Sequence, residues 1–305
     1  MSDFRIDITS AAFRGRPEAE RILLDSRALC EGCGVEFGVQ LHNTCDFEQI
    51  RYFVDRHVPL SAHAPVEQML NWNMAAADMS EIWKAVDENV DYLRSLNVKA
   101  AVFHGFFMTD LPVPAFGHGR SIFECMSEVF RPELARWPDM FTNRDFTGTP
   151  EYLERRERVR LRLRMLRERH PDLTICIEND YPGFGEGSML PGDLVYYGHP
   201  LCLDTGHLWL TSHLFGLDFL EAAKEMIASG NVKMMHLHAS KYDDSYPDRE
   251  WSDGHLPLSI PNAKAMRLGE LVTCAVAAGL RHIVLEIPAA TENDVRILLG
   301  YLGRL

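Results

Sequence analysis

The sequence predicts an α/β fold, namely a (β/α)8 (TIM) barrel formed by one domain over residues 1–305, with a long insertion after the fourth strand. Three observations support this prediction. A chain of 305 residues matches the size of one such barrel. Eight short apolar runs alternate with longer segments of helical periodicity. No linker or low-complexity tract interrupts the alternation.

The apolar runs predict strands, in order, at residues 4–9, 35–41, 59–63, 100–104, 173–178, 200–204, 232–238 and 282–287. Helical patterns predict helices at residues 17–33, 46–57, 80–96, 150–170, 188–197, 217–229, 265–278 and 292–302. A helix after each strand is typical of parallel strands with crossover connections, and eight such units favour closure into a barrel.

Residues 106–150 break this rhythm, because they far exceed the ~2–6 residues usual for such a loop. The segment is rich in proline and aromatic residues and follows the C-terminal end of the fourth strand, where the active sites of barrels lie. We expect it to act as a lid that walls one side of the substrate pocket. The alternative is a loop that only caps its own hydrophobic patch.

The helix after this insertion carries eight arginines between residues 155 and 169. We expect a solvated or oligomer-contact face there, with a polyanion site as the alternative. The net charge of −13 argues against a surface that coats DNA, because nucleic-acid binders usually carry a basic excess.

The seven cysteines do not form a disulfide-framework pattern, and we interpret the lone pair Cys30 and Cys33 as reduced thiols at a helix end. No apolar run approaches the ~18 residues that span a bilayer, and no signal peptide is visible. The sequence therefore predicts a soluble, cytoplasmic chain.

Ionisable residues occur at the C-terminal ends of six predicted strands, and the segment after the seventh strand adds two more. These residues are His63, His104, Glu178, Asp204, His207, His236, His238, Asp253, His255 and Glu286. Side chains at these strand ends converge on one pocket in a barrel. Any one of them alone is as well explained by hydrogen bonding in a core.

Together they indicate a metal site, because burying carboxylates beside imidazoles costs several kcal/mol per ion unless the charge is neutralised. Imidazole and carboxylate ligands suit zinc, with manganese or iron as alternatives. Asp204 and His207 have a spacing that lets one bind from the strand end and the other from the first turn beyond it. His238 projects to the same side of its strand as His236, as a ligand, a supporting residue or a substrate contact.

These motifs resemble the xylose isomerase-like TIM barrels and, among them, the endonuclease IV family of apurinic/apyrimidinic endonucleases. The shared pieces are HAP, VFH, IEN, CLDTGH, MHL with SK, D-x-H and LE-x-P. The resemblance covers the whole chain except residues 106–150. It implies up to three zinc ions, with manganese as the alternative, and a supporting or substrate-binding role for His238 and Lys241.

In the site implied by the resemblance, His63 and His104 hold one metal, which Glu178 bridges to a second held by Asp204, His236 and Glu286. His207, Asp253 and His255 hold the third. Glu178 or Glu286 is the implied catalytic group, because either can position or deprotonate the attacking water. The implied chemistry is phosphoester hydrolysis.

Duplex DNA is a disfavoured partner. Val66 stands where the family has a tyrosine that helps to open the duplex, and the aromatic insertion has no counterpart there. A small anionic or sugar-like substrate is therefore expected.

Three hypotheses follow. The first is a multinuclear zinc hydrolase acting on a phosphoester or a similarly compact anion. The second is a sugar or sugar-phosphate isomerase or epimerase with one divalent ion held by Glu178, Asp204, His236 and Glu286. In that reading the two glutamates move protons on either face of the substrate. The third is a metal-binding barrel without turnover, although such a protein has no physical need for nine ionisable groups.

Overall fold

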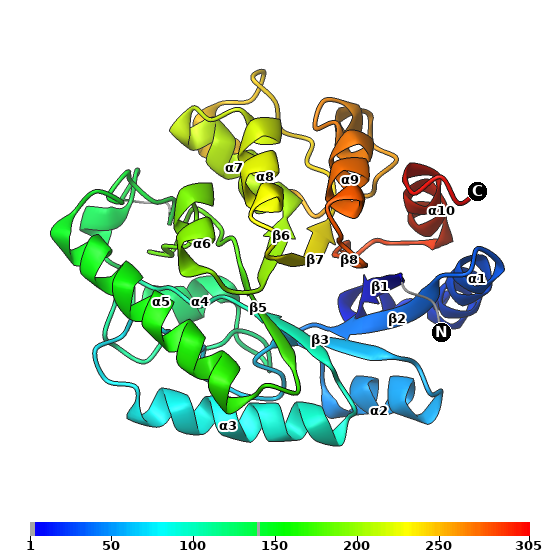
Figure 1. The fold of residues 1–305 in the computed structure, drawn as a ribbon, viewed down its shortest axis with the longest axis horizontal. Coiled ribbons are helices and arrows are strands. Elements are labelled where there is room, and N and C mark those ends of the chain that lie inside the picture. The colour runs from blue at the N-terminus through cyan, green and yellow to red at the C-terminus, as the bar shows by residue number, and fades with distance from the viewer. Residues whose placement is uncertain (1–3, 139–140) are drawn as a thin grey trace.

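The computed structural model describes residues 4–138 and 141–305, and in these ranges eight parallel strands close into a barrel in chain order (Figure 1). The strands are β1 (Arg5–Thr9), β2 (Glu36–Leu41), β3 (Leu60–Ala64), β4 (Ala100–Phe103), β5 (Thr174–Glu178), β6 (Leu201–Asp204), β7 (Val232–Leu237) and β8 (His282–Leu285). Each lies where the apolar pattern placed it, to within one or two residues at its ends. The predicted (β/α)8 barrel is confirmed.

Helices surround the barrel, and the described helices are α1 (Ala19–Gly32), α2 (Phe47–Asp55), α3 (Ser80–Ser95), α4 (Ile122–Ser127), α5 (Pro150–Arg169), α6 (Pro191–Tyr197), α7 (Thr205–Phe215), α8 (Phe219–Ala228), α9 (Leu268–Ala277) and α10 (Glu292–Tyr301). Short 3-10 turns occur at η1 (Ser10–Phe13), η2 (Pro132–Leu134), η3 (Asp248–Glu250) and η4 (Pro261–Lys264).

Side-chain caps fix where several helices begin. Asp46 accepts a hydrogen bond from the backbone N–H of Gln49 at the start of α2, and Asp218 accepts one from Glu221 at the start of α8. Such caps satisfy backbone donors that have no partner within the helix. The starts of α2 and α8 lie within two residues of the predicted ones, whereas α6 and α9, for which the described residues provide no side-chain cap, begin three residues later than predicted.

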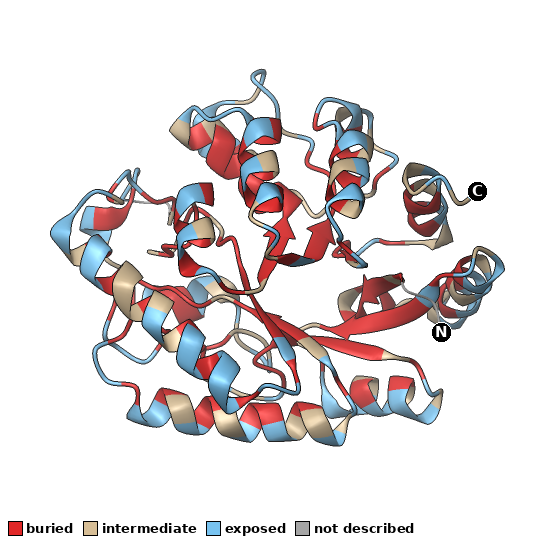
Figure 2. Cartoon of the chain, viewed as in Figure 1, coloured by how far each residue is buried: buried red, intermediate tan, exposed pale blue. Residues whose placement is uncertain are grey.

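The hydrophobic core lies between the strands and the inner faces of the helices, as the burial pattern of Figure 2 shows. A second, smaller group of buried side chains fills the barrel interior itself: Val102, Cys176, Cys202, Met234 and Val284. This interior layer closes the floor on which the residues at the C-terminal strand ends rest.

Helix α7 was not predicted. Its sequence, TGHLWLTSHLF, lacks a polar stripe, and most of its residues are buried. Amphipathic periodicity detects helices with one solvated face, and this helix has none to detect. It begins directly at the end of β6, where Asp204 accepts a hydrogen bond of 2.6 Å from the backbone N–H of His207.

The insertion 106–150 contains the short helix α4 and packs a small core of its own, formed by Phe107, Val113, Cys125, Met126 and Val129. It is anchored to α5 by Arg155, a residue that is only 6% exposed. The Arg155 guanidinium donates to the backbone oxygens of Ala75 and Thr109 and pairs with Asp110 at 2.8 Å.

The other arginines of α5 also have partners within the chain. Arg156 pairs with Asp193 at 2.6 Å, and Arg162 donates to the backbone oxygen of Met74 at 2.7 Å. The arginine run is therefore largely engaged in holding neighbouring segments.

Cys30 and Cys33 lie at the end of α1 as free thiols. Among the described residues no helix combines the length and the apolarity needed to cross a bilayer.

Candidate metal centre

A cavity of about 290 Å³ opens at the C-terminal end of the barrel. Its lining includes six of the predicted metal ligands: His63, His104, His207, Asp253, His255 and Glu286. The other three, Glu178, Asp204 and His236, are fully buried beneath it. The fold therefore brings all nine predicted ligands to one place.

The deepest group is centred on one nitrogen of His236. Its Nδ1 lies 2.7 Å from a carboxylate oxygen of Glu178 and 3.1 Å from one of Glu286. Asp204 is paired in register with His236 across β6 and β7, and its carboxylate lies 3.8 Å from the same nitrogen. Four ligands from the ends of four adjacent strands thus meet within the reach of one cation.

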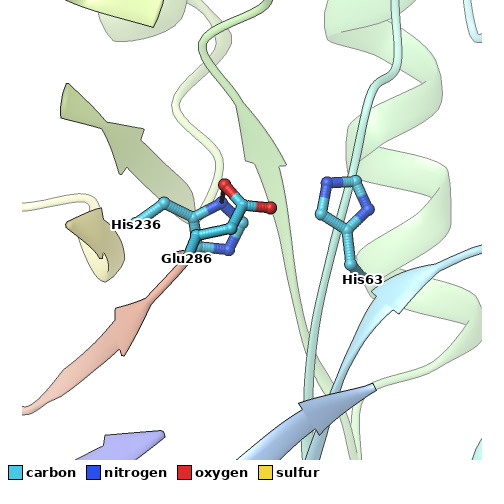
Figure 3. A group of neighbouring side chains, drawn as sticks. All are labelled: His63, His236 and Glu286. Carbon is cyan, nitrogen blue, oxygen red and sulfur yellow. Dashed lines mark ion pairs between the residues drawn. The ribbon is translucent and has the colours of Figure 1, made fainter. Parts of the chain in front are cut away.

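His63 and His104 form a second group beside Glu178. Nε2 of His63 lies 3.2 Å, and Nε2 of His104 3.7 Å, from the same oxygen of Glu178. Figure 3 shows His63 approaching from β3 while His236 and Glu286 come from the other side of the barrel. Glu178 therefore stands between the two groups, where a bridging carboxylate is expected.

The third group comprises His207, Asp253 and His255. Nε2 of His207 lies 3.5 Å and Nε2 of His255 3.0 Å from the same oxygen of Asp253. His207 comes from the first turn of α7, and the other two come from the loop after β7. The donor atoms of the three residues all lie within 4.8 Å of one another.

Hydrogen bonds orient three of these imidazoles. Nδ1 of His207 donates to the backbone oxygen of Asn179 over 2.9 Å, and Nδ1 of His255 donates to that of Glu286 over 2.9 Å. Nδ1 of His104 lies 3.0 Å from the Asp180 carboxylate. In each case Nε2 is left to face a carboxylate of the site, which is the arrangement that metal-binding histidines usually show.

His238 lies behind the predicted metal ligands. Its Nε2 contacts the Asp204 carboxylate at 3.0 Å, and its ring stacks on that of His255 with the centroids 4.1 Å apart. The sequence left three roles open for His238, namely metal ligand, supporting residue or substrate contact. Its position behind Asp204 favours the supporting role. Lys241, by contrast, is exposed and lies over the rings of Tyr242 and Tyr246, away from the residues that line the cavity.

The charges at this site are strongly coupled. Burial alone would lower the pKa of His104, but the carboxylates of Glu186 and Glu178 raise that pKa to about 9. Burial opposes the charging of His255 as well, yet Asp253 raises its pKa to about 10. Desolvation would raise the pKa of Glu178, and His236 and His104 instead hold it well below the ordinary value. The carboxylates of Glu178 and Asp253, whose pKa values lie well below the ordinary ones, are therefore ionised and require nearby positive charge.

Divalent cations fit this donor set. The side-chain nitrogens His63 Nδ1 and His236 Nε2 are buried and make no hydrogen bond with the described residues. All nine side chains offer nitrogen or oxygen ligands, and several sets of three lie within 4.8 Å. Without cations the histidines must carry protons to balance the carboxylates, and divalent ions supply the same positive charge directly.

Sequence reasoning missed several cavity residues in loops. Glu186 lies between glycines after β5, is 6% exposed and has a carboxylate oxygen with no hydrogen-bond partner among the described residues. Burial raises its pKa to about 8. His42 follows β2 and also lines the cavity. The strand-end rule that found the other histidines applies equally to His42.

No protein-family model matches the sequence, and a comparison with curated proteins finds no match. Solved structures do match. A D-tagatose 3-epimerase-like protein is 15% identical with a TM-score of 0.57, over 98% of this chain and 97% of that chain. A xylose isomerase domain protein from Planctomyces limnophilus is 12% identical with a TM-score of 0.52, over 99% and 95% of the two chains.

An AP endonuclease, family 2, from Brucella melitensis is 14% identical with a TM-score of 0.50, over 98% of this chain and 99% of that chain. At such identities the likeness concerns the fold. This chain shares its overall fold with these three proteins.

Proposed function

We propose that this chain is a divalent-metal-dependent hydrolase that binds up to three cations, with zinc the favoured ion and manganese the alternative. Its expected substrate is a phosphoester or a similarly compact anion. The observation that carries the proposal is the presence of two complete ligand groups beyond the four-residue core. His63 with His104 lies on one side, and His207 with Asp253 and His255 lies on the other.

Charge supports a multinuclear site for an anionic substrate. The nine residues include the four carboxylates Glu178, Asp204, Asp253 and Glu286. One divalent cation would leave this set net negative, which repels an anion. Three would leave it net positive, which attracts one. The number of cations and the charge of the substrate are therefore linked.

The cations would supply positive charge that polarises a substrate oxygen and lowers the pKa of a water molecule. The chain's own residues provide the rest. Glu286 lines the cavity and can orient or deprotonate the attacking water, whereas Glu178 is fully buried and holds the groups together. Glu186 faces the same cavity and, while protonated, can donate a proton to a leaving oxygen.

Duplex DNA remains a disfavoured substrate in this proposal. None of the described residues that line the cavity is lysine or arginine, and aromatic side chains of the insertion form much of its wall. Duplex recognition depends on cationic contacts to the phosphates.

A second candidate function is sugar epimerisation with one cation. The observation that favours it is the four-residue core around His236, which would suffice for a single ion between two glutamates. This reaction moves a proton to and from a carbon atom, so an epimerase exchanges that hydrogen with solvent.

The test is hydrolysis of 4-nitrophenyl phosphate and bis(4-nitrophenyl) phosphate by the metal-loaded chain. Chelation should abolish hydrolysis and zinc or manganese should restore it. Glu286→Gln should lower kcat by at least about 100-fold. Glu36→Gln, at an exposed position at the start of β2, is the matched control and should leave kcat unchanged. Absence of hydrolysis, together with deuterium entering a sugar substrate in D2O, would establish the second candidate instead.

A further inference from the structure

One wall of the cavity is apolar. It is formed by five residues of the insertion and one of the loop after β5, and we call them the apolar wall: Phe107, Phe116, Ile122, Phe123, Met126 and Phe184. Phe123 is 60% exposed, and the others are buried or half-buried. A single exposed apolar residue is ordinary, but a contiguous apolar patch that lines a cavity indicates a binding surface.

The wall is held in place by packed rings. The Phe184 ring lies 5.6 Å from that of Tyr181 and 5.2 Å from that of Phe141, measured between centroids. Phe123 meets Phe184 edge-on at 5.9 Å. Tyr181 in turn packs against the metal-site residue His207 at 5.8 Å. The apolar wall is thus continuous with the metal site through direct ring contacts.

The backbone at Phe184 has a φ of 57°. This left-handed conformation costs a bulky residue roughly 1–3 kcal/mol and persists where the surrounding structure enforces it. The conformation is stabilised by a hydrogen bond from the Phe184 N–H to the backbone oxygen of Phe141. A glycine would adopt this conformation without strain. The presence of a phenylalanine at a strained position therefore indicates that its aromatic ring is needed there.

The lining of the cavity combines two kinds of chemistry. It includes imidazoles and carboxylates of the metal site as well as the side chains of the apolar wall. The cavity of about 290 Å³ is at the lower limit of the ~300–1,000 Å³ typical of small-molecule sites. This space suits a polar head with one ring-sized group.

We propose that the substrate joins an oxygen-rich head group, which the metal ligands face, to an apolar group of about one aromatic ring, which the apolar wall holds. This inference specifies the substrate of the proposed function. Only its statement about the head group rests on that function. The preference for a ring follows from the wall whichever head is correct. Simple sugar phosphates and abasic DNA lack such a group.

The experiment measures calorimetric binding of two matched pairs of probes to the metal-loaded chain. Phenylphosphonate and methylphosphonate share an anionic head, and 1-phenylethane-1,2-diol and ethane-1,2-diol share a neutral one. In each pair whose head binds, the phenyl compound should bind at least about 10-fold more tightly, because even one methylene in an apolar pocket is worth ~10–200-fold. Binding of the diols but not of the phosphonates would contradict the proposed function, whereas the inference of an apolar substrate group would remain valid.

The variants locate the effect. Phe123→Ala should remove most of the phenyl preference and leave binding of the small probe within about twofold. Phe47→Ala is the matched control, because Phe47 is 63% exposed and lies on α2 away from the cavity. Equal binding within both pairs, no binding of any of the four probes, or an unchanged phenyl preference in Phe123→Ala overturns the inference.

Discussion

Nε2 of His238 lies 3.0 and 3.2 Å from the two carboxylate oxygens of Asp204. The backbone N–H of His255 donates to Nδ1 of the same ring over 3.1 Å, so the proton of His238 is on Nε2. His238 therefore donates to Asp204, and one ring connects the third ligand group with the deepest one.

Removing this donor should weaken metal binding without removing a ligand. We expect His238→Ala to lower metal affinity by about 10–100-fold, as for other residues that orient ligands. Titration of the metal-free chain with zinc measures this. His57→Ala, at an exposed position after α2, is the control and should bind zinc as the wild type does. Unchanged affinity in His238→Ala would show that Asp204 needs no such support.

Gly206 should be irreplaceable for a steric reason. A Cβ atom added at this position would collide with the ring of His238 and lie 2.6 Å from the backbone oxygen of Asp253. Gly206→Ala should therefore lower the free energy of unfolding by roughly 1–3 kcal/mol and reduce the zinc content.

Gly192→Ala is its matched control, because the nearest atom to a Cβ there is a flexible glutamate oxygen at 3.7 Å. Gly192 lies in α6, where alanine is favoured by up to ~1 kcal/mol. Urea unfolding and elemental analysis of the two variants distinguish these outcomes. Equal behaviour of the two variants would contradict the close packing at Gly206.

We expect the ionisation of Glu186 to lower the activity at alkaline pH, which gives the pH–rate profile an alkaline limb. Burial raises its pKa to about 8, so the carboxyl is protonated at neutral pH. Bound cations lower the pKa of a neighbouring carboxyl, and we therefore expect activity to fall as the pH rises through about 8 or slightly below.

Glu186→Gln keeps a hydrogen-bond donor but cannot transfer a proton. It should flatten this limb and lower kcat by about 10²–10⁴-fold, with the metal content unchanged. A pH–rate profile of the variant provides the measurement. A limb that persists in Glu186→Gln would exclude Glu186 as its origin.

His199 should make the fold sensitive to acid at a site unrelated to metal binding. Its Nε2 donates to the backbone oxygen of Ile175 over 2.8 Å, and burial lowers its pKa to about 4. Between pH 4 and the unfolded value near 6.5 the unfolded state binds more protons, so stability rises with pH across this window. From pH 7 to pH 4 the loss due to this group is up to about 3 kcal/mol.

His199→Gln should therefore lose less stability than the wild type over the same change. The comparison is the difference between the two urea-unfolding free energies at pH 7 and pH 4. A difference that stays constant with pH would mean that His199 does not resist protonation in the folded state.

The strands and the six predicted ligands at their ends were predictable because two simple rules apply to them. Short apolar runs mark strands that are buried on both faces, and a charged residue that ends such a run must face the pocket. Asp204 and His236 satisfy both rules and lie side by side in the barrel. His207, Asp253 and His255 lie in α7 and in the loop after β7, and the motifs CLDTGH and D-x-H indicated them instead.

The missed features escape these rules. Helix α7 is buried nearly all round, so its sequence has no amphipathic period. Glu186 and Tyr181 lie in loops, where side-chain direction depends on backbone conformation that no periodic pattern encodes. Lys241 belongs to a matching motif, yet the path of the loop after β7 places it on the tyrosines outside the cavity.

The most direct test of the central claim is metal content per chain by elemental analysis of protein purified without chelator. A multinuclear centre predicts about three divalent ions in the wild type. It also predicts loss of about one ion in each of His63→Ala, His104→Ala and His255→Ala, because each removes a ligand outside the four-residue core. One ion per chain, retained in all three variants, would contradict the claim and point to a single-ion centre formed by Glu178, Asp204, His236 and Glu286.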